Sequence, residues 1–242
     1  LRLPVLPADP AVQIAGRSAT PETVASIRAQ LGLDQPLLAQ YWNYLSNLAQ
    51  GDFGRSYLQK TEVSTLIQSR IGPSLSLMFF AILIELIIGL SAGIYSAMRR
   101  GKLSDNVVMV SSFIAISAPQ FIISIFVLYI FAVKLGWFPI GGYGKPIHYV
   151  LPALTLGILG SGWYSRVMRS SMIDVLRQDY IRTARAKGAP ISRIIRVHAF
   201  KNAVLPIIAM IGLDIGIFMG GIVVVESVFG WPGIGQLAWQ AI

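Results

Sequence analysis

Long apolar runs alternate with short polar segments over the last two thirds of the chain. Four runs are long enough to predict membrane-spanning helices, since a span needs roughly 20 predominantly apolar residues. They are residues 74–97, 106–133, 150–171 and 203–226. Pro119 interrupts the second run, and Arg166 and Arg169 lie in the last turns of the third. The pattern predicts an all-α, polytopic transmembrane helical bundle.

Residues 1–73 have a mixed pattern, which predicts a small helical region outside the membrane. Thr20 and Pro21 have the residue types of an N-cap and a first helical position. A second helix is expected over residues 36–50. Residues 63–71 form an apolar stripe at helical spacing, typical of an amphipathic helix on the membrane surface. The transmembrane domain is then expected to occupy residues 74–242.

Lys and Arg are concentrated in two polar segments between the predicted spans. Residues 99–105 and 166–201 hold most of the 20 basic residues of the chain. Because cytoplasmic loops of membrane proteins are enriched in Lys and Arg, both segments are expected in the cytoplasm. The segments expected outside are residues 1–73, 134–149 and 227–242. The net charge of +9 is therefore a topology signal, and a nucleic-acid partner is not expected.

Composition supports a membrane protein and excludes several kinds of site. Hydrophobic residues make up 54% of the chain and charged residues 13%, against about a quarter charged in soluble domains. There is no Cys, and the two histidines, His148 and His198, lack metal-ligand spacing, so no metal site is expected. The stretch GGYGK at 141–145 matches neither a potassium filter nor a phosphate-binding loop. No catalytic motif is present, so the chain is not expected to be an enzyme.

The second basic segment, residues 172–202, has the pattern of a structured helix–turn–helix. A helix is expected from Asp174 to Lys187, with Gly188 as its C-terminal stop. Pro190 is suited to open a second helix. Ala184 and Gly188 are small and would allow another surface to approach closely. Two interpretations stay open on these grounds, a docking element and a solvated connector.

Several stretches resemble the permease subunits of bacterial ABC importers, in the branch for peptides, nickel and glutathione. DYIRTARAKG (179–188) and HAFKNAVLP (198–206) are similar to the cytoplasmic signature loop of that family. LGLDQPLLAQYWNYL (31–45) and VVVESVFGWPGIGQL (223–237) resemble regions outside the membrane, as does GDFGRSY (51–57). One departure is Arg182-Thr183-Ala184, where the family has an acidic residue followed by two alanines.

The resemblance implies an importer in the bacterial inner membrane. Its expected partners are a second permease subunit, two cytoplasmic ATPases that carry ATP and Mg, and an external substrate-binding protein. The family has six spans, so the first and last are expected to lie outside this chain, which holds four. The ATPase-coupling residues implied are Asp179, Tyr180, Arg182, Ala184, Arg185, Ala186, Lys187 and Gly188. Arg182, Arg185 and Lys187 are available for ionic contacts.

The substrate is not fixed by these patterns. Di- or oligopeptides are the first expectation, and glutathione or a nickel chelate are alternatives within the same family. An interpretation of a different class is a membrane scaffold or receptor, which would have no ATPase partner.

Polar and small residues inside the spans are further candidates. Glu85, Asp214 and Glu226 are acidic residues within or at the end of spans, where an uncompensated charge is costly. They are interpreted either as a polar path or gate for substrate or as structural hydrogen-bonding groups. Gly212, Gly216 and Gly220 recur at four-residue spacing and allow close helix packing, between two permease subunits or within one. Gly89 and Gly93, in the first predicted span, have the same spacing and the same two interpretations, packing between two subunits or within one.

Overall fold

The computed structural model describes residues 10–16, 20–56, 59–219 and 222–241. The chain divides into two compact units, residues 1–68 and 69–242, and the boundary lies inside helix α4. The described part is almost entirely helical, as the sequence predicts.

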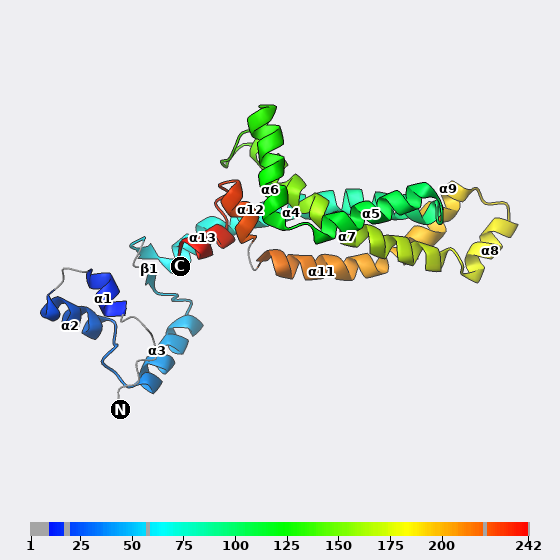
Figure 1. Ribbon diagram of the computed structural model, residues 1–242. Coiled ribbons are helices and arrows are strands. Elements are labelled where there is room, and N and C mark those ends of the chain that lie inside the picture. Colours follow the sequence, from blue (N-terminus) through cyan, green and yellow to red (C-terminus); the bar gives the residue numbers. More distant parts are fainter. Residues whose placement is uncertain (1–9, 17–19, 57–58, 220–221, 242) are drawn as a thin grey trace. The chain divides into compact units, whose positions relative to one another are not determined.

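The N-terminal unit contains three short helices, two short strands and the beginning of α4 (Figure 1). Thr20 caps α2 by accepting a hydrogen bond from the backbone N–H of Thr23 at 3.3 Å, which confirms the predicted N-cap. The helix expected over residues 36–50 is also present. The elements are α1 (Pro10–Ala15), α2 (Pro21–Gln30), α3 (Leu37–Ala49), β1 (Arg55–Ser56) and β2 (Thr61–Glu62).

The two strands were not predicted. They pair antiparallel, with Arg55 opposite Glu62 and Ser56 opposite Thr61. The Arg55 guanidinium donates to the Lys60 carbonyl from Nε at 3.1 Å and from Nη2 at 2.8 Å, which closes the hairpin.

Helix α4 runs from Val63 to Met98 without a break, over 36 residues. The separate surface helix expected over residues 63–71 is therefore wrong: that segment and the first predicted span form one helix. Pro73 lies inside α4, and neighbouring side chains use the Pro73 carbonyl. Ser76 Oγ donates to it at 2.8 Å and Trp231 Nε1 at 3.1 Å. The second of these hydrogen bonds attaches α4 to Trp231.

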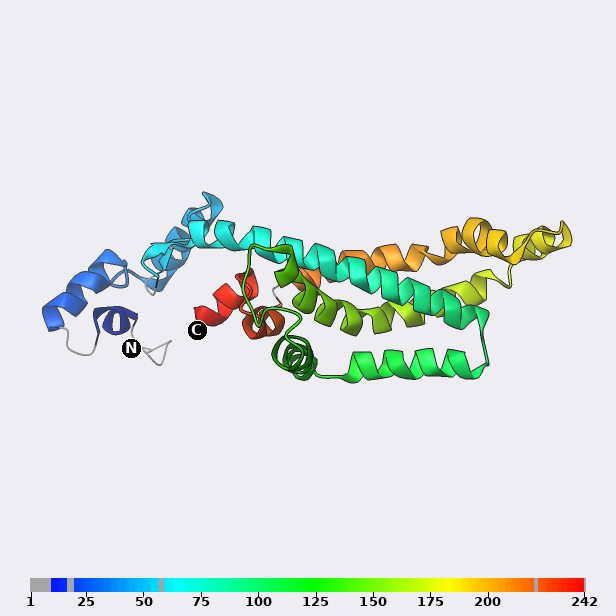
Figure 2. The ribbon, with the colours of Figure 1, turned by 90° about the horizontal axis from the view of Figure 1, so that it is seen from above.

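The second unit is an elongated bundle in which α4, α5, α7 and α11 run along a common direction (Figures 1 and 2). One end, the basic end, carries α8 and α9. The other, the outer end, carries α6, α12 and α13. The elements after α4 are α5 (Leu103–Ser117), α6 (Gln120–Leu128), η1 (Tyr129–Lys134), α7 (Pro146–Val175), α8 (Asp179–Ala186), α9 (Ile191–Arg193), η2 (Ile194–Ala199), α10 (Phe200–Ala203), α11 (Leu205–Met219), α12 (Val223–Val228) and α13 (Ile234–Gln240), where η denotes π-helix.

Fewer spans stand out than the four that were predicted. Among the described helices, α4 alone is long and apolar enough to cross a membrane. Two bent pairs also qualify if each is taken as one span: α5 with α6–η1, bent by 102°, and α9–α10 with α11, bent by 49°. The third predicted span lies in α7, which is not among these. The 102° bend falls at Pro119, since a proline has no N–H and forces the preceding Ala118 into an extended conformation.

The fourth predicted span, residues 203–226, is not one helix in the described residues. Helix α11 ends at Met219, and Ile222 precedes a separate helix, α12. Gly220, one of the three glycines in the predicted stripe, lies outside the described residues.

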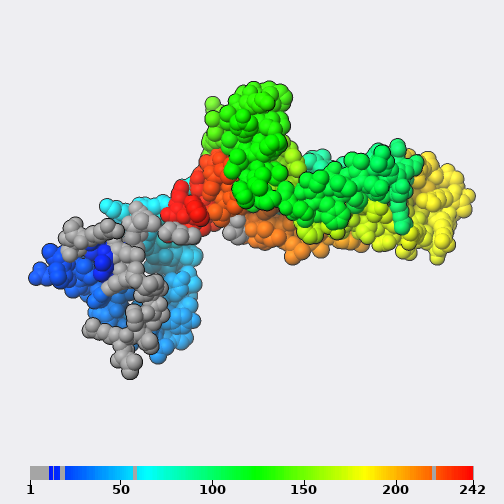
Figure 3. All heavy atoms as spheres, viewed as in Figure 1, coloured from blue at the N-terminus to red at the C-terminus, as the bar shows by residue number. Residues whose placement is uncertain are grey.

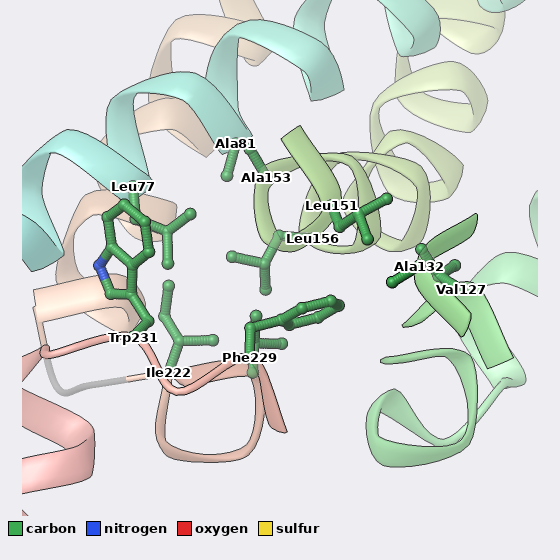
Figure 4. Close-up of a cluster of buried hydrophobic side chains, with 11 residues drawn as sticks. Leu77, Ala81, Val127, Ala132, Leu151, Ala153, Leu156, Ile222, Phe229 and Trp231 are labelled. Carbon is green, nitrogen blue, oxygen red and sulfur yellow. The ribbon is translucent and has the colours of Figure 1, made fainter. Parts of the chain in front are cut away.

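Two apolar clusters hold the bundle together, one toward each end. At the outer end, side chains from α4, α6, α7 and the α12 region form one buried cluster, in which the fully buried Trp231 lies next to Leu77 and Ile222 (Figure 4). At the basic end, the buried Tyr164, Met168 and Met172 of α7 pack with Ile181 of α8 and Ile207 of α11. Burial of apolar surface at these two places fixes the positions of the polar groups described next.

Glycines allow α4 and α5 to touch the backbone of α7. A Cβ at Gly93 would lie 2.6 Å from the Ser165 carbonyl oxygen, and one at Gly89 would lie 3.1 Å from the Ser161 carbonyl oxygen. On α7 itself, a Cβ at Gly162 would lie 2.7 Å from the Ser112 carbonyl oxygen. Gly89 and Gly93 therefore serve packing within this chain.

Candidate coupling face and interior acidic sites

The basic end is built around a helix–turn–helix, as the sequence predicts. Helix α8 ends at Ala186, and Gly188 has a φ of +74°, which a glycine adopts without strain. Pro190 then caps α9. The helix expected to begin at Asp174 is broken, however, because α7 continues to Val175 and α8 begins only at Asp179.

Ala184 lies at the border between the chain's own core and its surface. It is 8% exposed and packs with Ile181 in the apolar cluster at the basic end. Residues three apart share one face of a helix, so most of this face of α8 belongs to the chain's own core. Ala184 also lines an open hollow beside α8, so its contact with a partner stays a prediction. Gly188 differs, because it is exposed and no atom lies within 4 Å of where its Cβ would be.

The opposite face of α8 is polar and exposed, and it forms the tip of the bundle in Figure 3. Its exposed residues are Asp179, Tyr180, Arg182, Thr183, Arg185, Ala186 and Lys187. Arg182 and Asp179 form an exposed pair at 3.4 Å, which contributes little to stability. Asn202 Nδ2 donates to the Tyr180 hydroxyl at 2.8 Å and links α8 to α10.

An open hollow of about 610 Å³ lies between α8 and the segment that follows it. Its lining combines polar or cationic side chains with small and apolar residues: Tyr180, Thr183, Lys187, Arg193 and His198 with Ala184, Gly188, Ala189 and Pro190. The hollow and the α8 face together present positive charge toward whatever lies beyond the basic end.

A buried ion pair joins α5 to α7 near the same end. Arg169 donates to Asp105 twice, from Nε to Oδ1 at 2.7 Å and from Nη2 to Oδ2 at 2.7 Å. Asp105 also accepts from the Ser96 hydroxyl and, at 2.9 Å, from the Gly101 N–H. Both carboxyl oxygens of Asp105 therefore accept hydrogen bonds. The sequence analysis did not pair these residues, although an arginine in an apolar run needs an acidic partner.

Both carboxyl oxygens of Glu226, at the outer end, also accept hydrogen bonds, and neither donor is a cation. It is 0% exposed and accepts from the Ser74 hydroxyl at 2.7 Å and from the Gln236 N–H at 2.8 Å. Ser74 in turn accepts from the Ile234 N–H at 2.9 Å. A Cβ at Gly233 would overlap the Glu226 carboxyl group. These contacts tie α12 and α13 to α4 and favour the structural interpretation of Glu226.

Glu85 and Asp214 meet in the middle of the bundle, so the structure brings together two of the three predicted acidic residues. Glu85 of α4 is 2% exposed and lies close enough to Asp214 of α11 for their carboxyl groups to interact. The Tyr164 hydroxyl of α7 donates to Asp214. Glu85 Oε2 is buried and accepts no hydrogen bond. Tyr164 was not predicted; a tyrosine inside an apolar run, whose hydroxyl needs a partner, is the signal that points to it.

The glycines of α11 have open surroundings. No atom lies within 4 Å of where a Cβ would be at Gly212 or Gly216. Neither glycine therefore packs against the described part of this chain, which leaves the interpretation of an interface with another subunit untested. Within the described residues, no group of three His, Cys, Asp or Glu side chains is arranged to hold a metal ion.

Comparison with known proteins identifies the family. Residues 89–242 match the family described as the inner membrane component of binding-protein-dependent transport systems, and residues 3–78 match its N-terminal region. The chain belongs to this family. The resemblance inferred from the signature loop is thereby confirmed, and the protein is an ABC importer permease of the membrane.

Curated relatives that match nearly the whole chain include glutathione transport system permease proteins. The protein GsiC of Shigella flexneri serotype 5b (strain 8401) is 43% identical over 238 residues, which cover 98% of this chain and 78% of the relative. GsiC of Escherichia coli (strain K12) is 42% identical over the same length, with the same coverage.

Two solved structures share the fold. An inward-facing structure of the MetNI methionine ABC transporter has a TM-score of 0.60 and 19% identity, covering 72% of this chain and 79% of that chain. An amino acid ABC transporter crystallised with histidines has a TM-score of 0.54 and 19% identity, covering 73% of this chain and 78% of that chain. At this identity they support the polytopic helical permease fold alone.

Proposed function

We propose that this permease carries glutathione across the bacterial inner membrane, driven by ATP hydrolysis on partner subunits. The observation that supports glutathione is the 42–43% identity to glutathione permeases over nearly the whole chain. Small peptides, the first expectation from the sequence, are the second candidate, because glutathione is itself a tripeptide with free carboxylates and an ammonium group.

We further propose that α8 and its hollow are the docking face for one of two cytoplasmic ATPases that bind ATP and Mg. The exposed Arg182, Arg185 and Lys187 support this, since a positive surface selects a partner with a complementary acidic one. A second permease subunit and an external substrate-binding protein complete the proposed importer. Residues 1–73 are proposed to face the binding protein on the outer side.

Uptake by the purified transporter in proteoliposomes tests the substrate. The vesicles contain the permease with its candidate partner subunits, ATP and Mg inside, and the binding protein with radiolabelled glutathione outside. We expect ATP-dependent accumulation of glutathione, with competition from dipeptides and none from nickel ions. Accumulation of dipeptides without glutathione would favour the second candidate.

Charge reversal at the basic end tests the docking face. The triple variant Arg182→Glu, Arg185→Glu, Lys187→Glu is expected to lose the ATPase subunits on co-purification while still inserting in the membrane. These side chains are exposed, so the chain's own packing is retained, which Ala184→Arg would not achieve. The matched control is Lys134→Glu with Lys145→Glu, at the other end of the bundle. If no ATPase co-purifies with the wild type, the scaffold or receptor interpretation replaces the importer mechanism.

A further inference from the structure

The three acidic residues that are buried in the described part of the bundle, Asp105, Glu226 and Glu85, differ in how their oxygens are satisfied. Asp105 accepts from Arg169, a hydroxyl and a backbone N–H, and Glu226 accepts from a hydroxyl and a backbone N–H. Glu85 is equally buried, yet its Oε2 is the one buried side-chain oxygen or nitrogen in the described part of the chain without a hydrogen-bond partner. A buried acceptor without a donor costs free energy, so this position is suited to a donor from elsewhere.

The charge around Glu85 has the same implication. The charged group that interacts with Glu85 is another acid, Asp214, and neither acid takes part in the ion pairs Arg169–Asp105 and Arg182–Asp179. Two acidic groups side by side in an apolar interior require a proton or a cation to balance them. The Tyr164 hydroxyl completes a group of oxygens contributed by three helices.

A primary ammonium group fits these requirements. It carries one positive charge and three N–H donors. The carboxyl groups of Glu85 and Asp214 and the phenol oxygen of Tyr164 supply acceptors in one place. A free carboxylate, by contrast, would be repelled by both acids. A bare nickel ion would find no nitrogen or sulfur ligand among these three groups, and such ligands suit nickel best.

The flank of α11 provides an approach to the group. Asp214 is half-buried, and its neighbours Leu213 and Ile217 are 68% and 67% exposed. Gly212 and Gly216 on the same helix leave open space beside the backbone. Asp214 is therefore more accessible from this flank than Glu85, which is 2% exposed.

We propose that Glu85, Asp214 and Tyr164 form a site that binds the ammonium group of the substrate while it crosses the membrane. This inference rests on the proposed function and narrows it. Glutathione and free peptides carry such an ammonium group, whereas N-acetylated peptides do not. The site would therefore distinguish these compounds inside the permease, independently of the binding protein.

The test compares glutathione with N-acetylglutathione in proteoliposomes that contain the complete transporter. Affinities of the binding protein for both compounds are measured first, and each is supplied at a saturating concentration. Wild type is expected to transport glutathione at least tenfold faster, since hydrogen bonds to a charged group contribute about 1.5–3 kcal/mol each. Glu85→Gln is expected to lower glutathione transport about tenfold and to reduce the ratio of glutathione to N-acetylglutathione transport toward one.

Two further variants and a control keep the test informative if Glu85→Gln inserts poorly. Asp214→Asn and Tyr164→Phe are expected to reduce the preference for glutathione in the same direction. Thr155→Val is the control, because the Thr155 hydroxyl is buried in α7 and bonds only to the Leu151 carbonyl of the same helix, at 2.8 Å. It is expected to retain the wild-type preference.

The outcomes separate this inference from the proposed function. If wild type prefers glutathione and the variants keep that preference, or lose both rates equally, the ammonium site is refuted and the cluster is structural. If wild type transports both compounds equally, the site is refuted while glutathione transport stands. If wild type transports neither compound, the proposed function fails and the inference fails with it.

Discussion

Asp105 and Glu85 have the same exposed fraction, 2%, and opposite surroundings. Asp105, toward the basic end, meets a bidentate Arg169 and two further donors. Glu85, in the middle of the bundle, meets Asp214, and one of its oxygens has no donor at all. Burial alone therefore does not reveal what an acidic residue does. The balance of donors and charge around it does.

The difference separates a structural acid from a binding acid. A buried carboxylate with its own arginine joins two helices and leaves no acceptor for a ligand. A buried carboxyl group beside a second acid lacks a cation within its surroundings, so a proton or a cation has to balance it. Glu226 belongs with Asp105 in this respect, since hydroxyl and backbone donors satisfy it.

The largest expected loss of stability comes from removing Arg169, the cation that pairs with Asp105. Arg169→Met leaves Asp105 buried without a counter-charge and is expected to lower the free energy of unfolding by about 2 to 3 kcal/mol. The measurement is thermal or denaturant unfolding of the purified permease in detergent. The control is Arg166→Met, three residues earlier on α7, which loses the stacking of its guanidinium 4.4 Å from the Phe113 ring centroid and 5.8 Å from that of Trp163. That loss is expected to be about 1 kcal/mol or less. Equal losses for both arginines would show that Asp105 does not depend on Arg169.

Local signals predicted the helices better than they predicted the partners of the polar groups. The Thr20 cap and the stop at Gly188 follow from rules that act within a few residues, and both are present. Asp105 and Arg169 are 64 residues apart in sequence, so their pairing depends on how α5 packs on α7. The contact between Glu85 and Asp214 depends in the same way on α4 and α11.

Residues of one type have different structural effects in different parts of the bundle, because their tertiary surroundings differ. Pro73 stays inside a continuous helix, whereas the chain bends by 102° at Pro119. Gly89 and Gly93 contact the backbone of α7, whereas Gly212 and Gly216, at the same four-residue spacing, face open space. The spacing is visible in the sequence, but the surface that each stripe contacts is not.

Gly93 lies on α4 between Glu85 and Ser96, which donates to Asp105. Substituting it tests whether both acidic sites depend on the close contact of α4 with α7. A Cβ there would lie 2.6 Å from the Ser165 carbonyl oxygen and 3.1 Å from the Arg169 backbone nitrogen. Since a backbone cannot move aside locally, Gly93→Ala is expected to force α4 from α7 and cost about 2 kcal/mol of unfolding free energy.

Gly212→Ala is the matched control, because a Cβ at Gly212 meets nothing and alanine favours the helix. Its unfolding free energy is expected to be unchanged or slightly higher in the purified single subunit. Should both alanine variants unfold at the same denaturant concentration, the close contact of α4 with α7 would not be a determinant of stability.

The smallest effect on stability is expected at Glu85, the buried acid whose Oε2 accepts no hydrogen bond. Glu85→Gln removes no accepted hydrogen bond at Oε2, and its amide N–H₂ supplies a donor beside Asp214 where two acids met before. Its unfolding free energy is therefore expected to stay within about 0.5 kcal/mol of wild type or to rise. Asp105→Asn, the equivalent change at the matched site, places an amide against the Arg169 donors and is expected to destabilise. Unfolding both variants side by side in detergent, without substrate, makes the comparison direct. A loss in Glu85→Gln as large as that in Asp105→Asn would mean that the native protein already satisfies Glu85. There would then be no place for an ammonium group from a substrate.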